Sequence, residues 1–194
     1  MKKIFAMLLA LSMLFSFAAC GGTTAEPTTP ATDAPTDTPE ISTGPVVEGN
    51  DVTTDISALE VWLNEIIAKQ PVEFMGGVMP VDLTDPDGVK YMTGLDSVDG
   101  IVEAAVFEPM MGSIAFSLVM VRTAEGTDAK TVAEAMKAGI DQRKWICVEA
   151  NDLKVATYGD VAMLIMVDSN NGLSAQSYVD AFAQVAGAEL DFVA

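Results

Sequence analysis

The sequence predicts an α+β domain built as a two-layer sandwich, in which helices cover one antiparallel sheet of two hairpins. Three observations predict this fold class. Two pairs of apolar stretches are each joined by a short turn, as in β-hairpins. Segments with helical periodicity stand between and after the pairs, which gives the order β-β-α-β-β-α with an extra N-terminal helical region. Residues 52–194 of the 194-residue chain are long enough to form a single globular domain with one core.

The N-terminal helical region is expected to begin at Ser57, which forms a capping box with Glu60. A second, short helix is expected from Asp85 to Met92, because proline and acids suit a first turn. Residues 74–83 between them are rich in Gly and Met, and their structure stays ambiguous. The apolar stripe of the first helix consists of Leu59, Trp62, Leu63, Ile66 and Ile67.

The first hairpin is predicted to pair strands at 101–107 and 114–121 across the loop Glu108–Ser113. The second of these strands has two mainly apolar faces, because successive side chains point to opposite sides of a sheet. One face carries Ile114, Phe116, Leu118 and Met120, and the other carries Ala115, Ser117, Val119 and Val121.

The second half begins with a helix capped by Thr127, followed by a short strand or extended segment at 145–149. The second hairpin pairs 153–157 with 161–167. Because the sequence VAMLIMV at 161–167 is continuously apolar, we expect it to be buried on both faces of the sheet. A last helix follows a cap at Ser174 and ends at Gly187. The stripes of the two helices are Val132, Met136 and Ile140, and Tyr178, Phe182 and Val185.

Residues 1–19 have the pattern of a secretory signal peptide. Lys2 and Lys3 form its charged region, and the apolar stretch 4–17 is shorter than the about 20 residues of a membrane-spanning helix. The sequence FAACGG around Cys20 resembles a bacterial lipobox, in which the Cys thiol receives diacylglycerol and the signal is cut after Ala19. The alternative is ordinary cleavage, which leaves a free N-terminal Cys20.

Residues 20–51 are predicted to be the lipidated Cys20 and a disordered tether. From Gly21 to Asp51 there are five Pro, eight Thr, six acids and neither Lys nor Arg. Such a segment cannot bury enough apolar surface to fold, and proline with like charges keeps it extended. We expect a passive spacer. A partner-binding or O-glycosylated segment is the alternative.

Composition and charge exclude several classes of function. The chain contains no His, which excludes Ser-His-Asp and Cys-His catalysis and His-based zinc sites. Its formal net charge is −18, and removal of Lys2 and Lys3 with the signal leaves eight Lys and Arg against 28 acids, or −20. Nucleic acid and anionic membrane surfaces both require clustered cations, so neither is expected as a partner. Membrane contact is expected through the lipid anchor only.

No metal site or cofactor is expected. The acidic loop from Asp82 to Gly88 lacks the spacing of an EF-hand. Aligning Gly88 with the central glycine of that motif places Leu83 and Gly94 where oxygen ligands are needed.

No catalytic residue is expected either. Cys147 is the one thiol left beside an acylated Cys20, and it stands between Ile146 and Val148 in an apolar run. A nucleophilic Cys needs an adjacent base and a lowered pKa. We therefore expect a buried, inert thiol and a non-enzymatic protein.

Two segments offer what a contact surface usually needs, which is exposed apolar area or an Arg beside an aromatic. The loop Glu108–Ser113 carries Met110 and Met111, whose side chains adapt to several partners. The segment 143–145 is the densest cationic spot of the acidic chain. Packing of Met111 and Trp145 into the core is the alternative. The predicted contact surface consists of Glu108, Met110, Met111, Ser113, Arg143, Lys144 and Trp145.

The stretches EPMMGSIAFSLVMVR, DQRKWICVEA and YGDVAMLIMV, together with the lipobox and the tether, resemble small lipoproteins of Gram-positive bacteria. They are similar to the domain-of-unknown-function family numbered four-three-five-eight, over about Ser57 to Val185. The resemblance implies fold and location only. The family has no established activity, cofactor or catalytic residue to carry over.

Together, these features predict a lipoprotein anchored on the extracytoplasmic face of the cell membrane, with a non-enzymatic domain that binds an envelope protein or a small ligand. Two other functions stay open. A solute-binding component of a transporter usually needs two lobes. An envelope glycan hydrolase that uses carboxylates alone needs two carboxyl groups about 5–10 Å apart in a cleft.

The lipobox yields a direct prediction. The substitution Cys20→Ser removes the acylated thiol, so the protein should appear in the medium or keep its signal peptide. Fractionation of cells, with the N-terminus read by mass spectrometry, measures both. Membrane association with normal cleavage in the Cys20→Ser protein would contradict the anchor.

Overall fold

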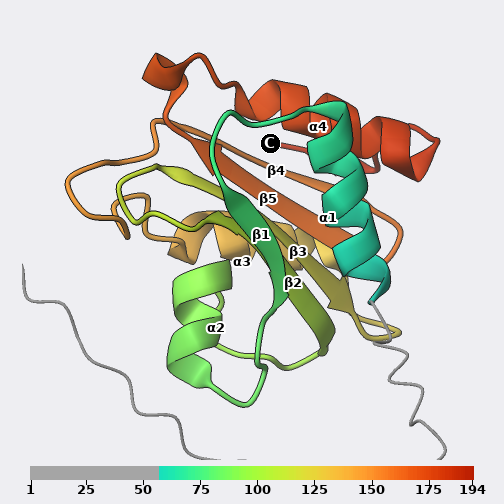
Figure 1. Cartoon of the computed structure of the whole chain (residues 1–194). Coiled ribbons are helices and arrows are strands. Elements are labelled where there is room, and N and C mark those ends of the chain that lie inside the picture. Colours follow the sequence, from blue (N-terminus) through green and yellow to red (C-terminus); the bar gives the residue numbers. More distant parts are fainter. Residues whose placement is uncertain (1–56) are drawn as a thin grey trace, which may run out of the picture. The chain divides into compact units, whose positions relative to one another are not determined.

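A computed structural model describes residues 57–194 (Figure 1). The predicted signal peptide, Cys20 and the predicted tether lie outside these described residues. The described part is an α+β fold with a six-stranded open antiparallel sheet packed against four helices. The helices are α1 (Ala58–Lys69), α2 (Pro86–Thr93), α3 (Ala129–Gly139) and α4 (Ala175–Ala186). The strands are β1 (Gly76–Pro80), β2 (Ile101–Pro109), β3 (Phe116–Thr123), β4 (Asp152–Tyr158), β5 (Val161–Val167) and β6 (Phe192–Val193).

The helices begin and end close to the positions that their sequence signals predict. The Ser57 side chain caps α1 by accepting a hydrogen bond from the Glu60 backbone N–H at 3.2 Å. The cap of α3 is Asp128, one residue after the predicted Thr127, and its carboxylate accepts from two backbone N–H groups of the first turn. Gly187 follows α4 with a φ of 68°, a left-handed conformation that favours glycine.

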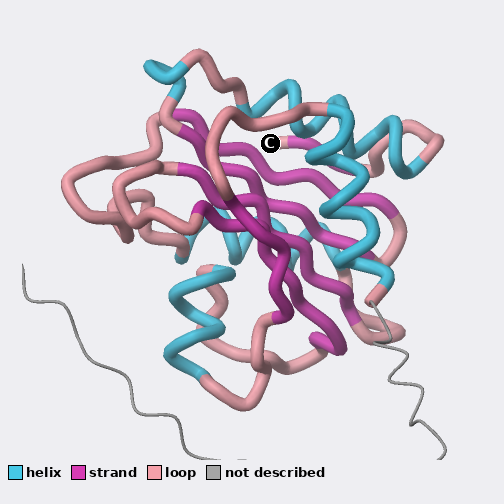
Figure 2. The backbone as a smooth tube through the Cα atoms, viewed as in Figure 1, coloured by secondary structure: helices cyan, strands magenta, loops and turns pink. Residues whose placement is uncertain are grey.

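Both predicted hairpins are present, and they lie side by side in the sheet. The strand order is β1-β2-β3-β5-β4-β6, and every neighbouring pair is antiparallel. The central strands β3 and β5 are therefore flanked by strands on both sides, as the tube in Figure 2 shows. The edge strands β1 and β6 were not predicted. β1 lies in the segment 74–83 that the sequence left ambiguous.

Helices cover both faces of the sheet, so the predicted two-layer sandwich is wrong and the domain has three layers. On one face, α1 and α4 pack against Phe116 and Leu118 of β3. On the other face, α2 and α3 pack against Val119 and Val121 of the same strand. Both faces need a covering layer because the central strands carry apolar side chains on both of them, since successive side chains of a strand point to opposite sides of the sheet. Every residue of β5 is buried, as predicted for VAMLIMV.

The segment 141–150 between α3 and β4 is a loop with turns and bends, and not the predicted short strand or extended segment at 145–149. Trp145 is buried against the α2–α3 face of the sheet, but Ile146 points to solvent. Cys147 has a φ of 63° and is exposed, so the prediction of a buried thiol is wrong. The apolar run around Cys147 belongs to a loop that turns its middle residues outward.

None of the helices between residues 57 and 194 combines the length and the apolar character needed to cross a membrane.

Candidate functional site

Two loops that are distant in the sequence meet at one end of the sheet. One joins β2 to β3, and the other is the segment 141–150 between α3 and β4. The backbone N–H of Ile146 donates a hydrogen bond to the carbonyl oxygen of Gly112 at 2.8 Å. Figure 2 shows the two loops beside each other at the left of the molecule. The fold thereby brings together the two segments that the sequence singled out, 108–113 and 143–145.

A buried ion pair joins the two loops. Lys144 Nζ lies 2.7 Å from Glu108 Oε1, although the residues are 36 positions apart in the sequence. The side chains are 1% and 11% exposed, respectively. The Ser117 hydroxyl, opposite Glu108 on β3, donates to Oε1 at 2.6 Å, and the Trp145 indole N–H donates to Oε2 at 3.4 Å. Both carboxylate oxygens of Glu108 therefore have partners, which a buried charge requires.

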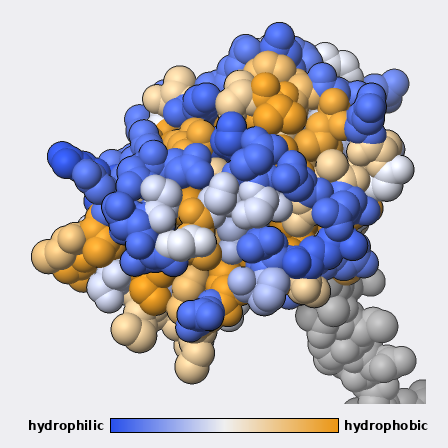
Figure 3. All heavy atoms as spheres, turned by 90° about the horizontal axis from the view of Figure 1, so that it is seen from above, coloured by the Kyte–Doolittle hydropathy of each residue, from blue (hydrophilic) through white to orange (hydrophobic). Residues whose placement is uncertain are grey.

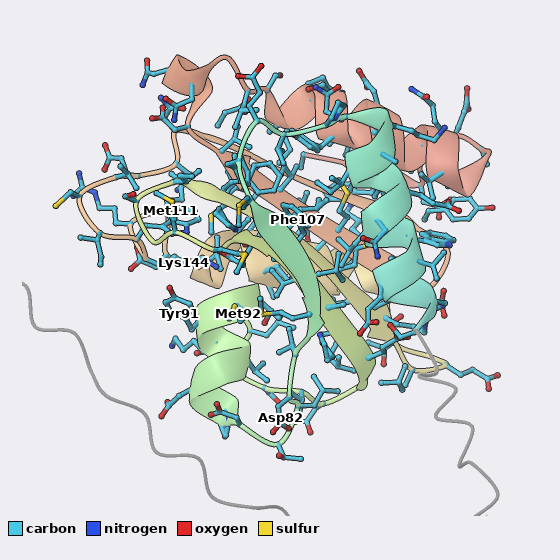
Figure 4. All side chains as sticks on the ribbon, in the orientation of Figure 1. Asp82, Tyr91, Met92, Phe107, Met111 and Lys144 are labelled. Atoms are coloured by element: carbon cyan, nitrogen blue, oxygen red, sulfur yellow. The ribbon has the colours of Figure 1, made fainter. Side chains whose placement is uncertain are left out.

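The Lys144 ammonium also connects the loops to α2. It donates to the Tyr91 carbonyl oxygen at 3.4 Å and lies 4.9 Å from the centre of the Tyr91 ring. The Tyr91 hydroxyl donates in return to the Lys144 carbonyl oxygen at 3.3 Å. In Figure 4, Lys144 lies between Met111 above it and Tyr91 below it. One cationic group thus fixes the positions of α2, the hairpin and the second loop.

Burial and charge act against each other at this cluster. Burial lowers the pKa of Lys144, and the charge of Glu108 raises it and so opposes that effect. Burial, followed by the negative charge of Glu108, raises the pKa of Tyr91. A buried pair of this kind stabilises little by itself. Removing one partner costs about 3–5 kcal/mol, because the other charge is left without compensation.

The predicted contact residues fall into two groups. Lys144 and Trp145 are buried beneath the surface and are not contact residues, and for Trp145 this agrees with the alternative of packing into the core. Their polar atoms are directed toward Glu108, which is also mostly buried. Arg143 is exposed and pairs with Glu149, which raises the pKa of its guanidinium. The remaining predicted residues, Met110, Met111 and Ser113, are exposed.

Four large apolar side chains stand out from this end of the domain, and we call them the methionine surface: Met75, Met110, Met111 and Ile146. Their exposed fractions are 73%, 73%, 60% and 73%. Met75 joins the set because its carbonyl oxygen accepts the Met110 N–H at 2.9 Å. Figure 3 shows apolar side chains gathered at the left of the view, where the loops lie. Met75 and Ile146 were not among the predicted contact residues, because Met75 lies in the ambiguous segment 74–83 and Ile146 in an apolar run that was expected to be buried.

The cluster contains a Ser and a Lys, the residue types of a nucleophile and its base, but not in a reactive arrangement. Ser117 is completely buried, so no substrate reaches its hydroxyl. That hydroxyl donates its hydrogen to Glu108 and accepts a hydrogen bond from Lys144 Nζ at 3.3 Å, and Lys144 is itself paired with Glu108. A base must instead be free to take the hydroxyl proton. Ser117 and Lys144 are therefore parts of the support beneath the methionine surface.

Elsewhere between residues 57 and 194, no group of three or more Cys, Asp or Glu side chains is placed to hold a metal ion. Comparisons with protein-family models, with curated proteins and with solved structures found no match. The resemblance to the lipoprotein family stays a prediction.

The ion pair yields a prediction on stability. The substitution Lys144→Met leaves the Glu108 carboxylate buried without its partner, so the free energy of unfolding should fall by about 3–5 kcal/mol. Arg143→Met is the matched control, because the neighbouring pair of Arg143 with Glu149 is exposed and screened by solvent, so its loss should change the free energy of unfolding much less. Denaturant unfolding of the full-length protein measures both. If the free energy of unfolding fell equally in the two variants, the buried pair of Lys144 would be no more important to the fold than the exposed pair of Arg143.

Proposed function

We propose that this chain is a lipid-anchored extracytoplasmic lipoprotein whose domain is a non-enzymatic binding module at the cell envelope. Its methionine surface binds a partner protein. The signal pattern and the lipobox at Cys20 support the location. The position of the methionine surface, at the end of a sheet whose two faces are covered by helices, supports the binding role.

The observation that carries the proposal is the exposure of four large apolar side chains in one place. Apolar side chains scattered over a surface need no explanation, but a contiguous group marks a contact site. Burying such side chains against a partner removes apolar area from water and stabilises a complex by roughly 25 cal/mol per Å². Methionine suits this role, because its flexible thioether adapts to the shape of a partner.

The buried ion pair supports the same role through rigidity. Binding orders loops and side chains, and that loss of entropy weakens a complex. In this domain the two loops are already held by Lys144, Glu108 and the bond from Ile146 to Gly112. A surface that is fixed in advance loses less entropy when a partner binds.

The charge of the domain narrows the choice of partner. Residues 57–194 contain eight Lys and Arg against 21 Asp and Glu, a net charge of −13. An apolar patch on so acidic a domain fits a partner whose own apolar patch is bordered by basic residues. Attraction between the opposite charges would also speed association at low salt.

The proposal predicts a loss of binding on substitution at the methionine surface. The full-length protein, immobilised in detergent, should retain an envelope protein from solubilised membranes of the producing cell. Replacing Met110 and Met111 together by Ser should weaken that retention by about tenfold, since each exposed Met buries part of its area in the complex. Quantitative mass spectrometry of the retained proteins measures the change.

The control is Val102→Ser, which changes an exposed apolar residue at the opposite end of β2. Thermal unfolding should show the same midpoint for all three proteins. The proposal fails if the double variant retains the same proteins in the same amounts as the wild type.

A further inference from the structure

Strand β1 leaves one of its two edges unpaired within residues 57–194. Its partner is β2 alone, and Figure 1 shows β1 in front of the other strands with no described segment drawn across it. The direction of its backbone groups follows from two hydrogen bonds. The Met75 carbonyl accepts from Met110, and the Val81 N–H donates to Ala104. Because bonded pairs alternate along an antiparallel ladder, residues 75, 77, 79 and 81 face β2.

The backbone groups of Gly76, Val78 and Pro80 therefore point away from the sheet. Pro80 confirms this assignment independently, because a proline has no N–H to donate and is tolerated in a strand where that N–H would face outward. The outward set consists of the N–H groups of Gly76 and Val78 and the carbonyl groups of all three. No residue between 57 and 194 forms a hydrogen bond with these groups.

This edge has little of the usual protection against strand pairing, which is limited to Pro80 at one end of the strand. Natural edge strands carry Lys or other charges, bulges or a covering loop, yet residues 74–81 contain no charged side chain. A side chain at Gly76 would collide with the Phe107 ring, which explains that glycine. A side chain at Gly77 would meet nothing within 4 Å. Packing therefore does not explain Gly77, whose own backbone groups face β2.

Acidic residues flank the open edge at both ends. Glu73 stands before β1 and Asp82 after it, and both are exposed. Two hydrogen bonds from Thr84 lower the pKa of Asp82 and keep its carboxylate charged. A second copy of this chain, paired edge to edge, would bring Glu73 and Asp82 of both copies together. Like charges at such short range oppose that arrangement.

We propose that β1 is a docking edge for an extended segment of a partner polypeptide, which adds to the sheet as a further strand. The charge pattern specifies a segment that is apolar in its middle and carries Lys or Arg at its ends. Its backbone would bond to Gly76 and Val78, and its side chains would contact Met79 of β1 and Met75 immediately before the strand, which lie on the same face. The inference rests on the proposed function, because Met75 also belongs to the methionine surface.

The test uses two synthetic peptides, acetyl-Lys-Val-Thr-Val-Thr-Val-Lys-amide and the same peptide with Glu at both ends. Nuclear magnetic resonance follows the amide protons of the full-length protein in uncharged detergent. In the free protein the Gly76 and Val78 amides should exchange quickly with solvent, and the Lys peptide should protect them. The Lys peptide should bind about tenfold tighter than the Glu peptide at low salt, and this difference should shrink as salt is added.

Two variants separate the backbone bond from side-chain packing. Val78→Pro removes the outward N–H and leaves the hydrogen bonds from β1 to β2 in place. A proline at 78 also favours an extended backbone at Gly77, which is the conformation of the strand. Val78→Ala loses the same packing but keeps the N–H. Binding of the Lys peptide should be about fivefold to tenfold weaker in Val78→Pro than in Val78→Ala.

Equal peptide binding by the two variants would overturn the inference, and so would equal affinity for the two peptides. Protection of the Gly76 and Val78 amides in the free protein would also overturn it, because another segment of the chain would then occupy the edge. The Met110→Ser/Met111→Ser protein keeps this edge and should still bind the Lys peptide. These outcomes distinguish the case in which the proposal for the methionine surface is wrong from the case in which the proposal for the β1 edge is wrong.

Discussion

The contact between Lys144 and Glu108 decides how one end of this domain is built. An ammonium and a carboxylate that are both removed from water lose several kcal/mol of hydration each, so they persist only where every polar atom has a partner. Here those partners come from α2, β2, β3 and the loop that contains Lys144 itself. The cluster can form only when all four segments are in place. It therefore specifies the position of the loop more than it adds to the stability of the domain.

The topology explains why contacts with other molecules are expected at the ends and edges of the sheet. Helices α1 and α4 cover one face and α2 and α3 the other, so neither face is open to a partner. The methionine surface lies at the end where the two loops meet, and β1 borders it through Met75. At the other edge, β6 is only two residues long. Of the two edges, β1 offers the longer stretch of unpaired backbone.

Much of the fold follows from local patterns in the sequence. Capping residues such as Ser57, apolar stripes and the turns of the two hairpins predict four helices and four strands close to their observed positions. β1 was not predicted, because Gly76-Gly77-Val78-Met79-Pro80 has neither alternating polarity nor a strong preference for strands. The third layer, formed by helices on the second face of the sheet, was not predicted for a different reason. The apolar run in β5 predicts burial on both faces, but it does not say which helix covers which face.

The candidate site was predictable only in part. Met110 and Met111 were candidates because apolar side chains in a hairpin loop can form a contact surface, but the sequence left packing of Met111 into the core as the alternative. The burial of Lys144 was not foreseen, since a Lys beside Arg143 in a charged segment is usually solvated. Its partner Glu108 is 36 positions away. Their meeting depends on how the hairpin and the α3–β4 loop pack together, which is a property of the tertiary structure.

The arrangement of this end of the domain depends on the direct interaction of Lys144 with Glu108, and a double-mutant cycle measures that interaction. The free energy of unfolding is determined for the wild type, Lys144→Met, Glu108→Leu and the double variant. If the two side chains stabilise each other as a buried pair, the double variant should lose less than the sum of the single losses, by about 2 kcal/mol or more. Losses that add within about 0.5 kcal/mol would show that the two groups act independently, and would contradict the account.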